Sequence, residues 1–251
     1  MNICPAKTHF MRKILLFVLP VVLLAASCRF GGGKKVHGNG NIQTEERQVS
    51  SFSQVEVHGA IKVYVSQGEL KPAKLEGDEN LLQYIEFKQE GNKLEVRTKR
   101  GYNLDASHDM KLYLSSPTYE VIDVSGACDI IGQTVISNPS KLEMQVSGAG
   151  DIKMEVDAPE VFTDISGSGS VTLKGKSRDY HCGLSGAGNA RCYDLLAENV
   201  WVDISGAGDA DVYASINLEA EVSGAGTVRY KGDAKITKQQ ISGAGSIKKV
   251  N

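Results

Sequence analysis

Apolar and polar residues alternate along most of the chain beyond residue 41. In "KLEMQVSGAGDIKMEV", residues 141–156, every second position is apolar or glycine, while the positions between them are mostly Lys, Glu, Asp, Gln or Ser. A period of two is typical of a strand with one buried face, whereas a helix needs a period near 3.6. The pattern therefore predicts an all-β protein.

A short motif interrupts this alternation at regular intervals. Seven copies of a serine followed by small residues, as in "SGAG", stand 22, 19, 19, 20, 18 and 19 residues apart. They begin at Ser125, Ser147, Ser166, Ser185, Ser205, Ser223 and Ser242. A weaker copy, "HGAI", begins at His58, 67 residues before Ser125, so the intervening segment is an insertion or a less regular coil.

The repeat length selects the architecture. A unit of about 19 residues is too short for a helical hairpin of about 34 or a propeller blade of about 40. It fits one coil of a β-solenoid, with three short strands and their corners, stacked on the next coil at about 4.8 Å. Each coil needs its neighbours, and the ends need caps, to bury the apolar face.

The paired glycines of the motif fit this interpretation. Where the solenoid wall bends, glycine permits a positive φ and removes a Cβ that would meet the neighbouring coil. The second glycine is replaced by Ile61 and Cys128 in the two earliest copies. We therefore expect a wider cross-section towards the N-terminal end.

Residues 42–124 have longer and less regular strand patterns. A hairpin is expected around Gly91 and Asn92, and "DENLLQYI" at 78–85 predicts a short helix with Asp78 as its cap. Because no linker separates this segment from the repeats, residues 42–251 are expected to form one domain. Its irregular β part spans 42–124, and its solenoid spans 125–251.

The first 41 residues have the composition of an export signal and a tether. Arg12 and Lys13 follow Met11, the better start, and precede the apolar run "ILLFVLPVVLLAA". The run ends in "LLAASC", which resembles the bacterial lipobox and predicts lipidation of Cys28. Residues 1–27 are then a lipoprotein signal peptide and 28–41 a flexible tether. The alternative is a plain secretory peptide in which Cys28 has no role.

Taken in order, these pieces resemble the bacterial family named putative auto-transporter adhesin, head GIN domain. The resemblance rests on "FSQVEVHGAIKVYVSQG", "LEGDENLLQYIEFKQEGNKLEV", "MKLYLSSPTYEVIDVSGACDI" and the "SGAGD" series, and covers about residues 42–251. It implies a secreted or lipid-anchored all-β protein with a right-handed β-helix. The resemblance assigns no functional residues to this chain.

Composition narrows the function classes. A net charge of −2 gives no basic surface for nucleic acid. Cys128, Cys182 and Cys192 fall at inward positions, which predicts buried thiols, and their number allows one disulfide at most. No spacing of Cys and His suggests a metal site, and no cofactor is predicted.

The sequence around the motif is not typical of a catalytic or phosphate-binding loop. A phosphate-binding loop needs a helix directly after its glycines, but strand-like segments follow here. Seven equivalent serines favour a structural role over a nucleophile. Their stacked hydroxyls would form hydrogen bonds along the column or to the adjacent backbone. His181, the one imidazole near Asp179, is expected to be an exposed residue.

The outward residue after each glycine pair is the more informative column. Asp129 and Asp151 would lie about 5 Å apart on adjacent coils. They could form a solvated ladder, a weak cation or glycan contact, or an acid pair for catalysis. A second outward column, before the motif, is mildly acidic and consists of Asp123, Gln145, Asp164, Gly183, Asp203, Glu221 and Gln240.

These observations favour a non-enzymatic lipoprotein of the outer membrane, facing the periplasm or the exterior. Its repeat surface would bind a glycan or protein ligand, as in adhesion, with the lipid on Cys28 as membrane anchor. No catalytic residue is assigned, and Asp129 and Asp151 are the candidate ligand or cation contacts. The alternatives are a carbohydrate-active enzyme that uses this acidic edge and a self-assembling structural protein. The oligomeric state stays open.

Overall fold

The structure is a computed structural model that describes residues 33–250. The predicted signal peptide, the start at Met11 and the lipidation site Cys28 lie outside the described residues. Within residues 33–250, no helix has both the length and the apolar character that a membrane crossing requires.

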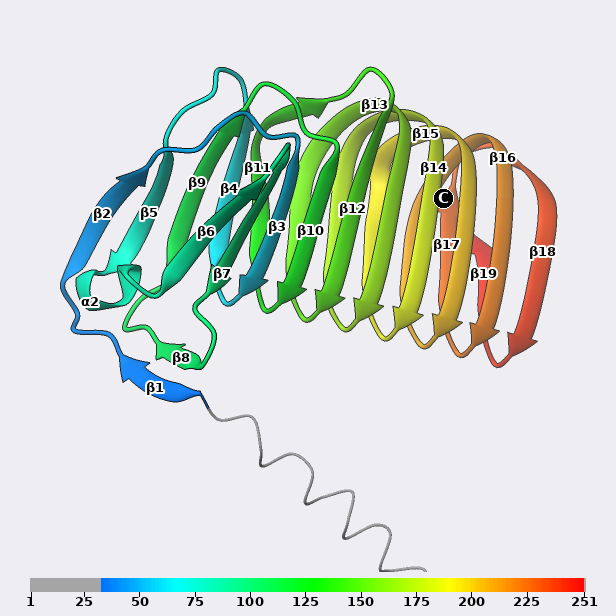
Figure 1. Ribbon diagram of the computed structural model, residues 1–251. Helices are drawn as coiled ribbons and strands as arrows, with labels where there is room; N and C mark the ends of the chain where they lie inside the picture. Colours follow the sequence, from blue (N-terminus) through cyan, green and yellow to red (C-terminus); the bar gives the residue numbers. More distant parts are fainter. Residues whose placement is uncertain (1–32, 251) are drawn as a thin grey trace, which may run out of the picture.

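The repeat region forms a β-solenoid whose coils stack along a rod (Figure 1). Every pairing between neighbouring repeat strands is parallel, and motif residues align, as in Ser147 with Ser166 and Gly148 with Gly167. The predicted fold class is therefore confirmed. The strands are β10 (Val121–Gly126), β11 (Asp129–Ser137), β12 (Lys141–Gly148), β13 (Asp151–Gly167), β14 (Ser170–Gly186), β15 (Asn189–Gly206), β16 (Asp209–Gly224), β17 (Thr227–Lys231), β18 (Lys235–Gly243) and β19 (Ser246–Lys249).

Each coil has one sharp corner. Strands β13, β14, β15 and β16 each run for 16 to 18 residues from one motif to the next. The expectation of three separate short strands per coil is wrong, because the parallel pairing continues around the other bends. Register shifts between Ile131 and Val135 and between Cys192 and Leu196 absorb the curvature there.

The two glycines of the motif have different roles. The first has a positive φ in every copy, +126° at Gly167, and it lies at the corner. The second has no positive φ, but a Cβ on Gly169 would lie 2.2 Å from the carbonyl oxygen of Gly150 on the preceding coil. In the early coils Ile61 and Cys128 place buried side chains at this position, so the corner there has more room.

The weak copy at His58 is a true coil of the solenoid. Strands β3 (Gln54–Gly59) and β4 (Lys62–Gln67) pair in parallel with β10 and β11, and His58 aligns with Ser125 despite the 67 residues between them. On their other side they pair with β7 (Lys93–Thr98) and β9 (Lys111–Ser116). Within the intervening segment, β7 and β9 thus form one further coil, stacked on the far side of β3 and β4.

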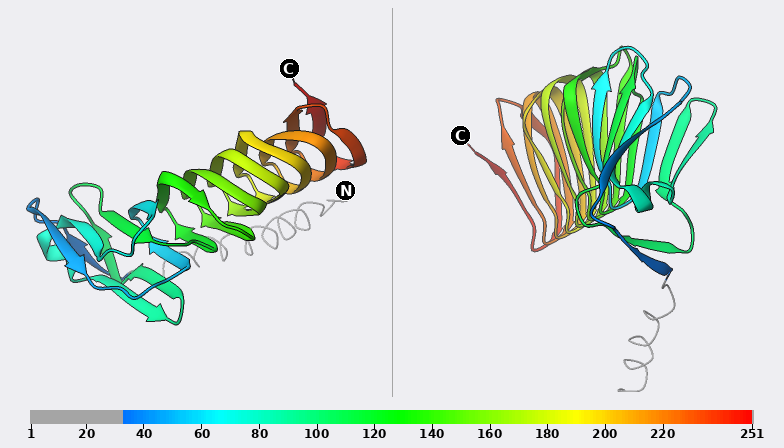
Figure 2. Two further views of the ribbon diagram at one scale, coloured as in Figure 1. Left: turned by 90° about the horizontal axis from the view of Figure 1, so that it is seen from above. Right: turned by 90° about the vertical axis from the view of Figure 1, so that its left-hand side faces the viewer.

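Antiparallel strands and a short helix cover this end (Figure 2). The hairpin at Gly91 is confirmed, but the helix spans only Glu79–Leu82, and the Asp78 side chain does not cap it. Its carboxylate accepts hydrogen bonds from the amides of Gly40 and Ser107, at 2.8 and 2.9 Å. The elements are β2 (Ile42–Arg47), β5 (Ala73–Asp78), α2 (Glu79–Leu82) and β6 (Ile85–Glu90), with β1 (Lys34–His37) paired to β8 (Tyr102–Asp105) beside them.

One core runs through all the coils. Its members are mainly Val, Ile, Leu and Ala from alternate strand positions. On a bend between motifs, side-chain amides bond along the rod: Asn217 donates to Asn199, and Asn199 donates to Asp179, at 2.8 and 2.9 Å. These bonds reinforce the coil register where alternation is weakest.

The three cysteines are buried free thiols, as predicted. Burial raises the pKa of Cys128 and Cys182 to about 11 and that of Cys192 to about 12. Because the thiolate is the reactive form, we expect none of the three to be alkylated by iodoacetamide at pH 8 in the native protein, and all three to be alkylated in denaturant. Peptide mass mapping would measure this, and native labelling of Cys192 would contradict it.

Candidate binding surface

Three aromatic rings stack along the outer face of consecutive coils. The ring centres of Phe162 in β13 and His181 in β14 are 4.5 Å apart, with an angle of 5° between their planes. His181 and Trp201 in β15 are 4.4 Å apart at 6°. All three are half-buried, so the prediction of an exposed His181 is wrong. Burial lowers the pKa of His181, which keeps its imidazole neutral near pH 7.

The two ends of this stack differ. The Lys141 ammonium lies 5.8 Å from the centre of the Phe162 ring and covers that end. At the other end, His181 occupies one face of the Trp201 indole, and its opposite face points to the coil where Glu219 is the register partner. Trp201 and Glu219 line a surface depression together, so the half-buried indole borders solvent there.

A glycine interrupts the acidic column beside the rings. Gly183 aligns with Asp164 on the preceding coil and Asp203 on the next. A Cβ on Gly183 would lie 2.4 Å from Asp164 Oδ1, so the Asp164 carboxylate leans over the space that the missing side chain leaves. The φ of Gly183 is not positive, so the missing Cβ, and not the backbone conformation, makes room for this close approach.

Two depressions meet at Gly183. One of about 380 Å³ extends towards the motif serines, and one of about 240 Å³ extends towards Trp201; Gly183 and Asp203 line both. We call this surface the aromatic notch, defined by Phe162, His181, Trp201, Asp164, Gly183, Asp203, Ser166, Ser185 and Ser205. It combines an aromatic face with converging polar groups, the usual composition of a small-molecule site.

Among the described residues, the carboxylates of the notch have no direct protein partner. Within the part of the chain that the structure describes, neither Asp164 nor Asp203 has an ion-pair or hydrogen-bond partner, whereas Glu143 pairs with Lys141 and Glu221 with Lys238. Burial raises the pKa of Asp164, and the nearby Glu143 raises it further. Asp164 and Asp203 are thus free acceptors.

The raised pKa of Asp164 gives a stability prediction with a defined sign. A carboxyl whose pKa is higher in the folded state costs stability when charged, and this cost disappears as pH falls below the unfolded-state value. We therefore expect Asp164→Asn to raise the unfolding midpoint slightly at pH 7 and to leave it unchanged near pH 3. Urea denaturation at both pH values would measure this. A variant less stable than wild type at pH 7 would contradict it.

The predicted contact residues Asp129 and Asp151 lie on the other side of the corner. Asp151 Oδ1 accepts hydrogen bonds from the amide and hydroxyl of Ser170 on the following coil, at 3.0 and 2.6 Å. Asp129 aligns with Lys62 on the preceding coil. Between residues 33 and 250, no three His, Cys, Asp or Glu side chains gather as metal ligands would. A ligand or cation at Asp129 and Asp151 stays a prediction.

The serine column does not form the predicted stack of bonded hydroxyls. Ser125 is half-buried, the other six motif serines are exposed, and among the described residues none of the seven hydroxyls makes a hydrogen bond to another protein group. The aligned backbone holds the corner together instead, as where the amide of Ala187 donates to the carbonyl of Gly167 at 2.8 Å. The hydroxyls are free to meet a ligand.

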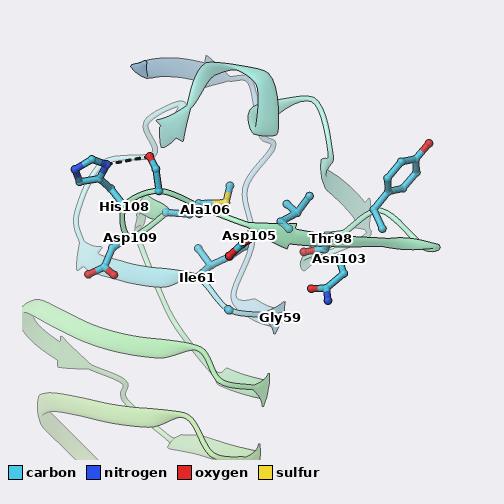
Figure 3. A pocket seen from close by; sticks show the side chains of 13 residues that line it. Gly59, Ile61, Thr98, Asn103, Asp105, Ala106, His108 and Asp109 are labelled. Atoms are coloured by element: carbon cyan, nitrogen blue, oxygen red, sulfur yellow. Dashed lines mark hydrogen bonds between the residues drawn. The ribbon is translucent and has the colours of Figure 1, made fainter. Parts of the chain in front are cut away.

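A separate cavity of about 540 Å³ lies near the capped end, beside the corner at Gly59 (Figure 3). Ser107 and His108 lie on its wall, with Ser107 Oγ 3.0 Å from His108 Nδ1 and 2.5 Å from Asp78 Oδ1. A catalytic relay would place the carboxylate on the imidazole, to hold its tautomer. Here the hydroxyl and the amide of Ser107 donate hydrogen bonds to Asp78, which fixes the loop, so this group does not have the arrangement of a relay.

Sequence reasoning missed the aromatic stack, although a signal exists. Phe162, His181 and Trp201 each stand four residues before a motif serine, at Ser166, Ser185 and Ser205. Alignment of the repeats on their serines places the three rings in one column. The acidic column is predicted by the sequence, but the depressions that meet at Gly183 are not.

A stack of parallel, in-register coils around one core defines a repeat protein of the β-solenoid class. The chain belongs to the family described as putative auto-transporter adhesin, head GIN domain, whose family model matches residues 51–234.

Solved structures share the fold. One titled a putative adhesin from Bacteroides fragilis NCTC 9343 has a TM-score of 0.72 and 20% identity, covering 86% of this chain and 100% of that one. One titled a putative lipid binding protein from Parabacteroides distasonis ATCC 8503 has a TM-score of 0.70 and 24% identity, covering 87% and 100%. A putative adhesin from the same organism has a TM-score of 0.69 and 24% identity, covering 86% and 100%. No protein of curated function matches this chain.

Proposed function

We propose that this protein is an exported, lipid-anchored envelope protein that binds glycans without chemical turnover, through the aromatic notch. The observation that carries the proposal is the Trp201 indole lining one depression with Asp203, next to a second depression lined by Asp164 and Asp203, neither of which has a protein partner among residues 33–250. An indole offers a large rigid apolar face at low conformational cost, and charged acceptors give strong, directional hydrogen bonds. Sugars present both an apolar ring face and hydroxyl donors.

The family supports a binding role at the cell surface. Its description names adhesins, and two of the similar structures carry that word in their titles. The pair Asp129 and Asp151 gives little support to a glycan-cleaving enzyme, because Asp151 accepts two hydrogen bonds from Ser170. An acid or base for sugar cleavage needs a carboxyl that is free to exchange its proton.

The test is glycan-array binding of the purified protein, compared with Trp201→Ala and with Tyr213→Ala, a matched half-buried aromatic outside the notch. We expect Trp201→Ala to weaken binding at least tenfold and Tyr213→Ala to leave it unchanged. No retained glycan, equal binding by both variants, or turnover of a bound glycan would each contradict the proposal.

The anchor needs its own experiment. In cells that produce the full chain, we expect incorporation of labelled palmitate into the protein, lost in Cys28→Ser and retained in the control Cys4→Ser. Equal labelling of the Cys28→Ser variant would show that Cys28 is not the anchor.

A further inference from the structure

We infer that the aromatic notch selects an uncharged, hydroxyl-rich sugar unit and rejects the corresponding acid sugar. This inference rests on the proposed function and names the ligand class of the same surface. It depends on three features: the kind of hydrogen-bonding groups in the notch, their charge, and the shape of the gap at Gly183.

The hydrogen-bonding groups demand a donor-rich ligand. Ionised Asp164 and Asp203 can only accept hydrogen bonds, and the neighbouring hydroxyls of Ser185 and Ser205 can accept or donate. Because neither carboxylate has a protein donor among residues 33–250, each has its acceptor capacity available to a ligand. Sugar hydroxyls are donors of this kind, and a hydrogen bond to a charged acceptor is about twice as strong as a neutral one.

The charge of the notch excludes anions. Two lysines on neighbouring coils, Lys141 and Lys238, are held in ion pairs by Glu143 and Glu221, and the pKa of Lys238 is raised by the hydrogen bond to Glu221 and further by the charge of Asp203. His181 is neutral near pH 7 because burial lowers its pKa. A carboxylate on the ligand would therefore face Asp164 and Asp203, while Lys238, the cation close to Asp203, is already paired with Glu221, so the repulsion costs affinity.

The shape limits the ligand to one ring at this point. Gly183 removes a single side chain from a column whose members are spaced by about 4.8 Å, the distance between neighbouring strands. Gln145 and Glu221 fill the same column on either side of Asp164 and Asp203. A ring seated over Gly183 has the Trp201 side of the notch on one flank and the motif serines on the other.

Trp201 is the only tryptophan of the chain, so its fluorescence reports binding at the notch directly. The probes are cellohexaose and β-1,4-mannohexaose, each compared with its oligomer oxidised to the acid at C6. We expect each bound neutral probe to change the emission and to bind at least tenfold more tightly than its acid counterpart. Asp164→Asn with Asp203→Asn should narrow this ratio to within about threefold.

Gly183→Gln tests the gap itself. Glutamine occurs in the same column at Gln145, and a Cβ on Gly183 would meet only the movable end of the Asp164 side chain within 3.4 Å, so the fold should persist. We expect at least a tenfold loss of neutral-probe binding with an unchanged unfolding midpoint. Glu155→Gln, outside the notch, should bind as wild type does.

The outcomes separate this inference from the proposed function. If array glycans bind and depend on Trp201 but acid and neutral probes bind equally, or if Gly183→Gln binds normally, the inference fails and the proposed function stands. If no probe binds and no array glycan is retained, both fail.

Discussion

Replacing Gly167 with alanine is expected to lower the free energy of unfolding by about 3 kcal/mol or more. The φ of +126° at Gly167 is a conformation that residues with a Cβ rarely adopt. The new Cβ would also lie 2.4 Å from the carbonyl oxygen of Gly148 on the preceding coil. That oxygen cannot move aside, because it accepts the amides of Ser168 and Gly169 at 2.8 and 3.0 Å.

The matched control is Ser168→Ala. Ser168 is the next residue of the same exposed corner, and every other copy of the motif carries alanine there. We expect Ser168→Ala to change the unfolding free energy by less than about 0.5 kcal/mol. Urea denaturation followed by circular dichroism would compare the two variants. A Gly167→Ala protein whose free energy of unfolding lies within about 1 kcal/mol of the wild-type value would contradict the tight corner.

Replacing Tyr180 with alanine is expected to cost about 3 to 5 kcal/mol, the range for removing a large buried ring. Tyr180 is 1% exposed in the core of the solenoid. Its hydroxyl lies 3.0 Å from Thr163 Oγ1 and 3.2 Å from Cys192 Sγ, so it joins three consecutive coils. Because each coil is stabilised by its neighbours, the cavity weakens the stack in both directions.

Tyr180→Phe separates the ring from its hydroxyl. This variant keeps the packed ring and leaves the Thr163 hydroxyl with only its longer contact, 3.5 Å to the carbonyl oxygen of His181, so we expect a loss of about 1 to 2 kcal/mol. The further change Thr163→Val should recover part of that loss, since it removes a buried hydroxyl that keeps only a long hydrogen bond. The unfolding free energies of the three variants measure this, and equal values for Tyr180→Ala and Tyr180→Phe would show that the ring is not packed as the structure places it.

The sequence predicts the solenoid well because its information is local and repeated. Alternation around Val146 or Ile152 and the spacing of the serines each identify the strand and the coil without knowledge of any contact. The buried cysteines follow from the same parity. The hairpin at Gly91 is likewise encoded by a short turn signal.

The N-terminal part could not be predicted in the same way. Its order in space, with β3 between β7 and β10, depends on pairings between segments that are distant in the chain. The Asp78 carboxylate illustrates the limit. Its sequence context predicts a helix cap, but the carboxylate instead accepts hydrogen bonds from the amides of Gly40 and Ser107 in distant loops. Local propensity is a weak preference that tertiary contacts override.

By itself, the sequence determined the all-β class, the coil length, the inward residues and the acidic column of the outer face, because each is a property of period and spacing. Only the tertiary structure decided which outward residues act together. It stacked Phe162, His181 and Trp201, and it placed Ser170 where it donates hydrogen bonds to the Asp151 carboxylate. It also left Asp164 and Asp203 unpaired at Gly183. The physical reason is that a side chain's partner on a neighbouring coil is set by the register and bends of the stacked backbone, which single-chain periodicity does not contain.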